Sequence, residues 1–411
     1  MDKIIRYGGL CMLSNAKRAL IIGGGVAGPV LALFLRRAGF APEVFEATSG
    51  PTATGGALGL APNGMNVLAA VDLVQQVREA SVTGSEWLFE NQAGEVLASS
   101  PGGDPARYGQ PTVMITRADL HRVLVERARE EGIPIHFNKS LVTLRDIPGK
   151  SVAARFSDGN SAEGDFVVGA DGIRSQVRQA IMPTAPKPVY TGMMAPGGFS
   201  PSVESNVRAR SNQRVHFIFG QNGFFGYFNA LTAEGPRTAW WSTASAPLPN
   251  KEQIGAAGQA ELRRRLIELH GQWAEPVPQL IQSAEAMLNI AIHDVPSLPG
   301  WSVGRTILIG DAAHAVAPHS GQGASMALED AQFLAKLLRD SQGVALDRVF
   351  AHFERQRRPR TDKVIALGRR NAQRKEMMSP VAYWIQQQMI RIFVPLTRAR
   401  RQDWLLAYKV E

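Results

Sequence analysis

Cysteine is almost absent from this chain of 411 residues: Cys11 is the only one, so no disulfide can form within the chain. A chain without disulfides is typical of a reducing compartment, and we therefore expect a cytoplasmic protein. Hydrophobic residues make up 45% and charged residues 20%, which is the composition of an ordinary globular protein with enough length for two or three domains.

Long uninterrupted apolar runs are also absent. The stretch 19–35 is apolar and long enough to consider as a membrane span, but its four glycines and one proline favour a buried strand, a tight turn and a helix. We therefore expect no stable membrane insertion. The first residues, MDKIIRYGGLCML, are too short and interrupted for the core of a signal peptide. We expect residues 1–15 to be a disordered N-terminal extension, with Met12 as a candidate start.

Acidic residues are scarce at the C-terminal end. From Ala351 onward there are 14 Lys and Arg against 5 Asp and Glu, and this difference of 9 equals the net charge of the whole chain. The excess is compatible with a solvated, arginine-rich helix face, or with steering of a phosphate-bearing cofactor or of an anionic surface. No nucleic-acid-binding motif is present, and aromatic residues do not alternate with the basic ones, so we expect no nucleic-acid partner.

Glycine, by contrast, is clustered near the N-terminus. The apolar run 19–22 leads into Gly23-Gly-Gly25-Val-Ala-Gly28 and then into a helical pattern, which is the G-x-G-x-x-G fingerprint between a strand and a helix. Gly23 permits the tight turn, Gly25 lets the backbone approach a pyrophosphate, and Gly28 lets the helix pack closely on the strand. The free N–H groups at the start of the helix favour a phosphate.

A second apolar run, Pro42-Glu-Val-Phe-Glu46, ends in an acid at the position where a carboxylate accepts the ribose hydroxyls of an adenosine. The sequence therefore predicts a dinucleotide site. The fingerprint does not distinguish NAD from FAD, but no second fingerprint is visible for a separate NAD(P)H domain.

Two further segments favour FAD. One runs from Asp165 through Asp171-Gly172 to Arg178, and the other is Gly310-Asp311-Ala-Ala-His314 followed by Pro318 and Gly321-Gln-Gly323. Together with the first glycine cluster they resemble the three fingerprints of single-component (class A) FAD-dependent monooxygenases, the family of the para-hydroxybenzoate hydroxylase fold. At the subfamily level the chain is similar to the small aromatic-ring hydroxylases and to the tetracycline-inactivating monooxygenases.

This resemblance implies roles for particular residues. Asp311 would bind the ribityl chain of FAD, and Arg117 would lie near the flavin. Asp171 belongs to a segment that touches FAD and helps NAD(P)H to dock, and the arginines that follow it, Arg174 and Arg178, are candidates for phosphate contacts. The turn Gly321, Gly323 and Ala324 would aim helix N–H groups at the pyrimidine edge of the ring, where reduced flavin carries negative charge. We interpret His314 as a structural hydrogen-bonding residue and assign no metal ligand.

The resemblance also implies the fold, an α/β protein with a Rossmann-like FAD-binding domain, a discontinuous antiparallel-sheet substrate domain and a C-terminal helix. We expect the FAD-binding domain at 16–80, 112–185 and 285–370, the substrate domain at 81–111 and 186–284, and a helical segment at 371–411. Period-two patterns predict strands at 214–220, 223–229 and 237–243. The C-terminal segment is interpreted as a helix that bridges the two domains, or else as an amphipathic surface that approaches a membrane or a partner.

The activity implied is that of a flavoprotein monooxygenase. NAD(P)H, either NADH or NADPH, reduces FAD, O2 forms a C4a-hydroperoxyflavin, and an aromatic, polycyclic or enolic small molecule is hydroxylated. Aromatic residues of the three strands are suited to excluding water, although their register is not readable from the sequence. Candidates for orienting or deprotonating the substrate are Arg214, His216, Tyr227 and His319, of which His319 lies within the loop that carries Asp311.

Two alternatives to a monooxygenase remain open, and a third is disfavoured by the sequence. One is an FAD-dependent reductase or dehydrogenase of a prenyl or quinone substrate with the same fold. A flavin-dependent halogenase is disfavoured, because the Trp-x-Trp-x-Ile-Pro motif is absent and Trp240-Trp241 does not match it. The other open alternative is a flavin-binding protein without catalysis. The sequence does not decide between a monomer and a homodimer.

Overall fold

The computed structural model describes residues 5–7, 10–12, 16–50, 56–203, 213–232, 235–248, 256–373, 378–396 and 403–410. The prediction of a disordered extension at residues 1–15 lies largely outside the described residues. Within that range the structure describes two short paired strands, β1 (Ile5–Tyr7) and β2 (Leu10–Met12).

One half of the architecture is a six-stranded sheet in the order β19-β20-β13-β3-β4-β9. Its strands are parallel except for β19 at one edge. The central strand β3 is buried from Ala19 to Ile22, which is the continuous apolar pattern of a parallel strand covered on both faces. The strands are β3 (Arg18–Ile22), β4 (Ala41–Phe45), β9 (Ile135–His136), β13 (Phe166–Gly169), β19 (Ser302–Val303) and β20 (Thr306–Leu308).

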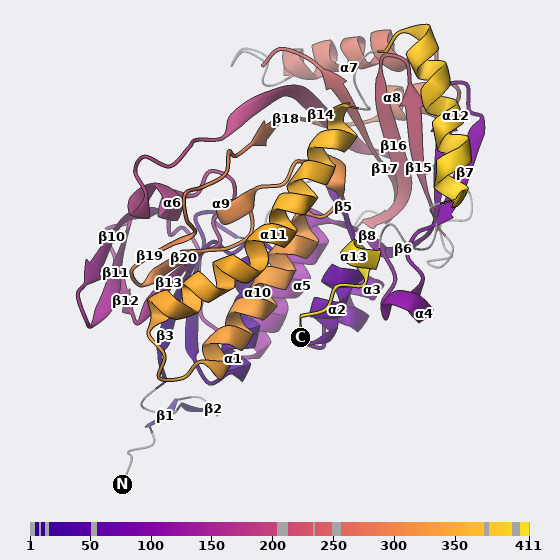
Figure 1. Cartoon of the computed structure of the whole chain (residues 1–411). Helices are drawn as coiled ribbons and strands as arrows, with labels where there is room; N and C mark the ends of the chain where they lie inside the picture. Colours follow the sequence, from indigo (N-terminus) through magenta and orange to yellow (C-terminus); the bar gives the residue numbers. More distant parts are fainter. Residues whose placement is uncertain are drawn as a thin grey trace.

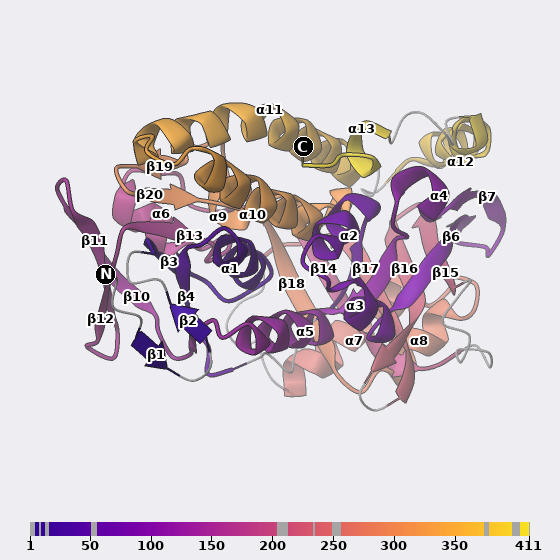
Figure 2. The same cartoon turned by 90° about the horizontal axis from the view of Figure 1, so that it is seen from below.

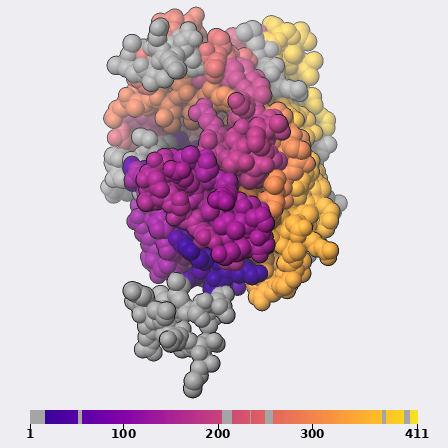
Figure 3. Space-filling model, turned by 90° about the vertical axis from the view of Figure 1, so that its left-hand side faces the viewer, coloured from indigo at the N-terminus to yellow at the C-terminus, as the bar shows by residue number. Residues whose placement is uncertain are grey.

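Helices cover one face of this sheet and a small antiparallel sheet covers the other. Helix α1 packs against both α5 and α10, and α11 lies over α10 (Figure 2). On the opposite face, β12 contacts β3; the residues of this small sheet face the viewer in Figure 3. The elements are α1 (Ala27–Arg37), α5 (Arg117–Glu130), α10 (Gly323–Asp340), α11 (Leu346–Gln373), β10 (Leu141–Ile147), β11 (Ser151–Phe156) and β12 (Ser161–Gly164).

The second half is a nine-stranded sheet in the order β18-β14-β17-β16-β15-β6-β8-β5, with β7 paired to β6. All its pairs are antiparallel except β6 with β15. The strands are β5 (Ala57–Leu60), β6 (Val82–Asn91), β7 (Val96–Pro101), β8 (Val113–Thr116), β14 (Val189–Pro201), β15 (Gln213–Gly220), β16 (Gly223–Thr232), β17 (Gly235–Ser245) and β18 (Met287–Asp294).

Four of these strands, β5 to β8, lie within residues 57–116, and the other five lie within residues 189–294, so the sheet is discontinuous in the sequence. It lies beyond one end of the parallel sheet (Figure 1). Helices α7 (Ala256–His270) and α8 (Val277–Ser283) lie at its far side, and α12 (Pro380–Leu396) lies along its edge beside β7. The short helix α13 (Asp403–Leu406) returns to the helical side of the molecule and contacts α2 (Pro62–Ala69).

The predicted fold class is confirmed: an α/β protein with a Rossmann-like sheet, a discontinuous and mostly antiparallel sheet, and a C-terminal helix. The three predicted strands are present as β15, β16 and β17. After β5 the chain forms two short helices, α2 and α3 (Val74–Glu79), which are separate because Asp72 adopts a positive φ of 59° between them. The division into domains stays a prediction.

Candidate active site

One large cavity lies where the parallel sheet meets the nine-stranded sheet, with a volume of about 2420 Å³. Residues of the glycine turn after β3, of the loop after β20, of the large sheet and of α12 all line it. Cavities of roughly 300–1,000 Å³ are enough for a single drug-sized ligand. This cavity therefore has room for a dinucleotide and a second molecule together.

The first glycine turn is built for close packing at two positions and for open space at a third. A Cβ on Gly28 would lie 1.9 Å from the carbonyl oxygen of Gly23, and a Cβ on Gly23 would lie 2.3 Å from that of Ala170. Gly23 also has a φ of +110°. A Cβ on Gly25 would meet no described atom within 4 Å, and Gly25 lines the cavity. Gly25 thus leaves room beside the backbone that a pyrophosphate could fill.

Helix α1 begins directly after this turn and points its N-terminus at the cavity. Val26 and Ala27 line the cavity, and no described side chain caps the helix. The first N–H groups of a helix need partners, and they carry the positive end of the helix dipole. An uncapped helix start that faces a cavity is suited to an anion such as a phosphate.

Glu46 follows β4 and lines the same cavity. Its Oε2 accepts a hydrogen bond from the N–H of Gly24 at 2.7 Å, and its Oε1 accepts one from the N–H of Thr48 at 2.9 Å. The two N–H groups hold the carboxylate in place beside the glycine turn. Each carboxylate oxygen accepts more than one hydrogen bond, so both retain capacity for hydroxyl donors such as those of a ribose.

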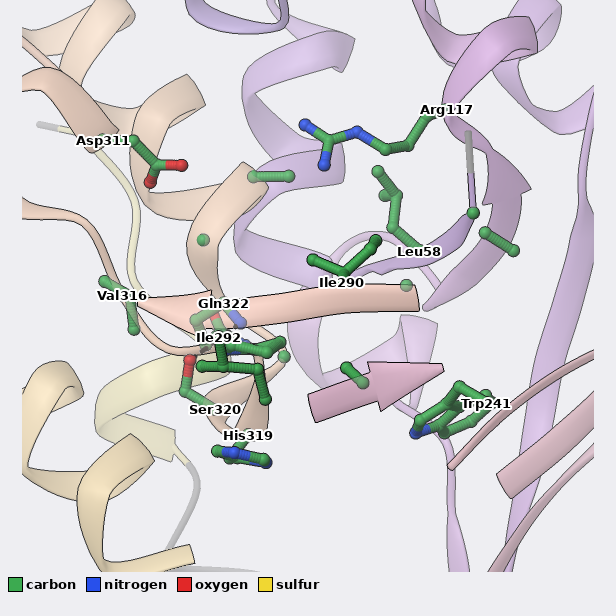
Figure 4. A pocket seen from close by; sticks show the side chains of 18 of the residues that line it. Leu58, Arg117, Trp241, Ile290, Ile292, Asp311, Val316, His319, Ser320 and Gln322 are labelled. Carbon is green, nitrogen blue, oxygen red and sulfur yellow. Dashed lines mark hydrogen bonds between the residues drawn. The ribbon is translucent and has the colours of Figure 1, made fainter. Parts of the chain in front are cut away.

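Asp311 and Arg117 enter the cavity from opposite walls (Figure 4). Asp311 starts α9 (Asp311–His314) after Gly310, which has a φ of +57°, and Arg117 is the first residue of α5. The protein around it raises the pKa of the Asp311 carboxyl by burial, and the charges of His314 and Arg117 act in the opposite direction. The side chain is nevertheless open to the cavity, where a polar ligand can reach it.

A second helix start faces the cavity close to Asp311. Gly321 has a φ of +63° and Gly323 opens α10; a Cβ on either would meet no described atom within 4 Å. Both glycines and Ala324 line the cavity, and no described side chain caps α10. The two glycines leave space for a flat group to lie against this helix start, where N–H donors favour negative charge.

Asp171 lines the cavity, but its carboxylate also has a structural task. Its Oδ2 accepts hydrogen bonds from the N–H groups of Gln176 at 2.7 Å and Val177 at 3.0 Å, at the start of α6 (Gln176–Ile181). Burial raises the pKa of this carboxyl, and hydrogen bonds to it act in the opposite direction. Asp171 therefore shapes the turn that follows β13 at the edge of the cavity.

The two arginines after Asp171 differ in position. Arg174 is exposed and lines the cavity, as a phosphate contact requires. Arg178 is buried and donates hydrogen bonds to the carbonyl oxygens of Ile173 at 2.6 Å and Ala312 at 2.9 Å. Arg178 is thus not placed to meet a phosphate; it ties the turn after β13 to the α9 segment.

Behind the Asp311 loop lies a buried network of charges. His314 Nε2 is 2.6 Å from Asp330 Oδ2, which also accepts the N–H of Gly310 at 2.9 Å, and Arg357 donates to Asp330 Oδ1 at 2.7 Å. Burial alone would raise the pKa of Asp330, but His314, Arg357 and the Gly310 N–H lower it to about 2. This geometry agrees with the structural role expected for His314.

The network continues to the C-terminal segment. Arg357 donates to Glu329 at 2.8 Å, and Arg360 pairs with Glu329 at 2.7 Å while donating to the carbonyl oxygens of Trp404 and Leu405. Each charged group of this network has a partner of opposite sign or a carbonyl, as burial requires. The loop that carries Asp311 is therefore fixed, through α10 and α11, to α13.

The large sheet gives the cavity an aromatic wall. Val215, Phe217 and Phe219 of β15 line it at alternate positions, as the period of a strand requires. The Phe217 ring is 5.6 Å from that of Phe89 and 6.0 Å from that of Trp241, between centroids. Trp241 appears at the end of the cavity away from Asp311 in Figure 4. This wall suits a flat, apolar ring system.

The same alternation places three of the four candidates for substrate contact outside the cavity. His216 and Tyr227 lie on the opposite face of the sheet, stacked on each other at 4.1 Å, and His216 Nδ1 is 3.1 Å from Glu90 Oε2. Arg214 pairs with Glu86 at 3.2 Å. None of the three lines the cavity. We therefore do not include them in the proposed site, because the register of the strands places them on the face of the sheet away from the cavity.

His319 is the candidate that does reach the cavity. It lies in the 3₁₀ turn η2 (Pro318–Ser320), between the Asp311 loop and α10, and its carbonyl oxygen accepts a hydrogen bond from Asn371 at 3.1 Å. In Figure 4 its side chain lies beside Ser320, below Ile292. Its position in the cavity lining just before the start of α10 suits contact with a second molecule.

Several lining residues were missed by the sequence reasoning. Ile290 and Ile292 of β18 enter the cavity at alternate positions, and Ile385, Met389 and Phe393 of α12 enter it at spacings of four. Both periodicities are visible in the sequence, but neither says which face points inward. Among the described residues, no group of three or more His, Cys, Asp or Glu side chains is placed to hold a metal ion.

These observations test whether FAD fits. Two uncapped helix starts open onto one cavity, with open space at Gly25, Gly321 and Gly323. A carboxylate stands beside each start, Glu46 and Asp311. A flavin dinucleotide carries a pyrophosphate, a ribose, a polyhydroxyl chain and a ring with an anionic edge. The donors and acceptors of the cavity match these four groups in chemistry, so the residues fit FAD.

Comparison with known proteins agrees with this reading. The FAD-binding-domain family model matches residues 17–367. The aurachin C monooxygenase/isomerase of Stigmatella aurantiaca is 30% identical over 91% of this chain and 93% of its own length. The 3-amino-4-hydroxybenzoate 2-monooxygenase of Streptomyces cremeus is 31% identical over 88% of each chain.

A solved structure supports the fold. The Klebsiella pneumoniae protein HpxO, complexed with FAD and uric acid, superposes with a TM-score of 0.82 at 22% identity, covering 97% of this chain and 99% of its own. Within the described residues, no helix is long and apolar enough to cross a bilayer.

Proposed function

Since the chain belongs to the FAD-binding-domain family and is an FAD-dependent monooxygenase that uses NAD(P)H, we propose that its substrate is an uncharged aromatic or polycyclic molecule bound against the wall of Phe89, Phe217 and Trp241. The observation that carries this proposal is the lining of the cavity. Among the described residues, the strands of the large sheet contribute no Lys, Arg, Asp or Glu to it.

Bound FAD supplies electron transfer from NAD(P)H and activation of O2, which is chemistry that side chains cannot provide. The chain's own residues bind and orient. The N–H groups at the start of α1 would hold the pyrophosphate, Glu46 the ribose and Asp311 the ribityl chain. The start of α10, at Gly323 and Ala324, would stabilise negative charge at the ring edge.

The aromatic wall would hold the substrate ring and keep water away. An apolar ring gains binding free energy from the area it buries against Phe217 and Trp241. Exclusion of water matters because a reactive oxygen species held in the site is otherwise lost to hydrolysis. A carboxylate placed against this wall would lose its hydration without gaining a cation, which is costly.

His319 is proposed as the group that orients, or takes a proton from, a hydroxyl on the substrate ring. Removal of that proton makes the ring more electron-rich and hence more reactive toward an electrophilic oxygen. Replacement of His319 by Gln is expected to lower kcat/KM about 100-fold, while FAD content stays unchanged. His216→Gln serves as the matched control, because the His216 side chain lies on the face of the large sheet away from the cavity.

The experiment compares paired substrates. The purified FAD-loaded protein is offered neutral phenols, quinolones and polycyclic phenols, each beside its carboxylated analogue, and NAD(P)H consumption and the mass of the product are followed. We expect the neutral member to stimulate consumption and to gain one oxygen from labelled O2. If carboxylates are preferred throughout, the proposal is wrong, and Arg370, which lines the cavity from α11, becomes the candidate anion contact.

A reductase of a prenyl or quinone substrate, the alternative reading of the sequence, predicts NAD(P)H consumption without O2 and a product without added oxygen. The relatives, which are monooxygenases by name, support oxygenation instead. We further propose that the protein acts in the cytoplasm as a monomer or homodimer, without a nucleic-acid partner. The single cysteine and the absence of a nucleic-acid-binding motif support this proposal.

A further inference from the structure

On helix α12 a row of polar residues faces the protein and a group of apolar residues is exposed, which is the reverse of an ordinary surface helix. Its polar residues face the protein: Tyr383 donates a hydrogen bond to the carbonyl oxygen of Phe219 at 3.0 Å, Gln387 accepts one from Asn91 at 3.2 Å, and Arg391 pairs with Glu95 at 2.8 Å. These three residues recur every four positions and so share one side of the helix.

Four apolar residues of α12 are exposed on its outer side. The exposed fractions are 68% for Val381, 61% for Trp384, 53% for Ile392 and 76% for Leu396, and none of these four lines the cavity. We call them the outer face of α12. A soluble helix normally buries its apolar side, so an exposed one of this size marks a surface for interaction. In Figures 1 and 2 α12 lies at the periphery of the molecule, with no described element over its outer side.

Charge indicates what covers this face. Helix α12 contains no Asp or Glu, and the stretch 374–401 that includes it has six Lys and Arg against one Glu. An apolar helix face with a tryptophan in a basic region has the features of a helix that lies in the interface of an anionic bilayer. Trp is favoured at that depth because its ring is apolar and its N–H is polar. A second copy of the same basic chain would instead bring like charges together.

We propose that the outer face of α12 docks the protein on an anionic lipid surface. The helix lies in the interface and does not cross the bilayer. The adjoining flank of the same helix, through Ile385, Met389 and Phe393, lines the cavity. Docking therefore places the cavity wall next to a phase in which apolar molecules concentrate. The proposal does not depend on the identity of the substrate, because lipid binding is measured without turnover.

The test is sedimentation of the FAD-loaded protein with vesicles. Vesicles of equal parts phosphatidylglycerol and phosphatidylcholine are compared with vesicles of phosphatidylcholine alone, at low and at high salt. We expect binding to the anionic vesicles, weakened by salt, and a blue shift of tryptophan fluorescence that Trp384→Phe removes. The double substitution Val381→Gln and Ile392→Gln should weaken the partition coefficient about tenfold or more.

The matched control is Val142→Gln, which changes an equally exposed valine on β10 at the far end of the molecule. It should leave vesicle binding unchanged, and all variants should retain FAD, which reports folding. Three results would overturn the proposal: no binding by the unmodified protein, equal binding to neutral and anionic vesicles, or a homodimer that the double substitution dissociates without any vesicle binding. The last result would assign the outer face to a second copy of the chain.

Discussion

Alanine at Gly25 and alanine at Gly28 should separate cofactor binding from folding, although the two glycines are only three positions apart. The added methyl group at Gly25 points into open cavity, where no described atom lies within 4 Å. The methyl group at Gly28 would lie 1.9 Å from the carbonyl oxygen of Gly23, which is backbone and has little freedom to move. One substitution therefore changes the ligand space and the other changes the packing of α1 on the turn.

The magnitudes follow from these contacts. At Gly28 the overpacking costs about 3 kcal/mol, the gain in helix propensity offsets about 1, and the free energy of unfolding falls by about 2 kcal/mol net. At Gly25 the apoprotein should unfold within about 0.5 kcal/mol of the parent. Its methyl group would displace the pyrophosphate from charged hydrogen bonds worth about 2 kcal/mol, so FAD should bind about 30-fold more weakly.

Two assays measure these effects. Urea unfolding of the apoproteins, followed by tryptophan fluorescence, gives the midpoint shift, and titration with FAD, followed by quenching of flavin fluorescence, gives the dissociation constant. Gly25→Ala should change only the second quantity, whereas Gly28→Ala should change the first. If Gly25→Ala binds FAD like the parent, the pyrophosphate does not lie at this turn and the reasoning is refuted.

Three other changes probe the rest of the site. Asp311→Ala should weaken retention of FAD strongly; a variant that purifies with full flavin content would count against this assignment. Asp330→Asn should destabilise the protein by about 3 kcal/mol at pH 7, because it removes the buried carboxylate that Arg357 donates to and that His314 contacts. The pKa of Asp330 is lowered to about 2, so this stabilisation is present above about pH 4 and is lost as the pH falls toward 2; a difference from the parent that does not vary with pH would contradict it. Phe217→Ala should open the aromatic wall and raise the yield of H2O2 per NAD(P)H, measured with a peroxidase assay, and an unchanged coupling ratio would exclude a water-excluding role.

The parts of the site that depend on local backbone geometry could be predicted from the sequence. A strand, a glycine turn and a helix start follow one another within a few residues, so the positions of Gly23, Gly25 and Gly28 needed no tertiary information. The same holds for Gly321 and Gly323 before α10. That both turns meet at one cavity came from the family resemblance and not from the local pattern.

Long-range geometry could not be predicted in the same way. The register of β15 decides whether His216 or Phe217 faces the cavity, and a shift by one residue exchanges them. That register is set by pairing with β6, which lies over a hundred residues away in the chain. The sequence alone left both residues as candidates, whereas the sheet turns the phenylalanine inward.

The buried charge network left a weaker signal. Glu329 and Asp330 stand in an otherwise apolar helical stretch, which already indicates buried partners of opposite sign. Their partners, Arg357 and Arg360, lie among many arginines of α11, and only the packing of α10 on α11 selects them. Part of the C-terminal basic excess is therefore buried and paired with acids, and does not belong to the solvated helix face that one reading of the sequence proposed.

The most direct measurement of the central claim is a crystal structure of the protein with FAD bound. The account predicts the pyrophosphate at Gly25 and the start of α1, the ribose at Glu46, the ribityl chain at Asp311, and the ring between the start of α10 and the aromatic wall. A structure with FAD outside this cavity, or with the ring away from Gly321 and Gly323, would contradict it.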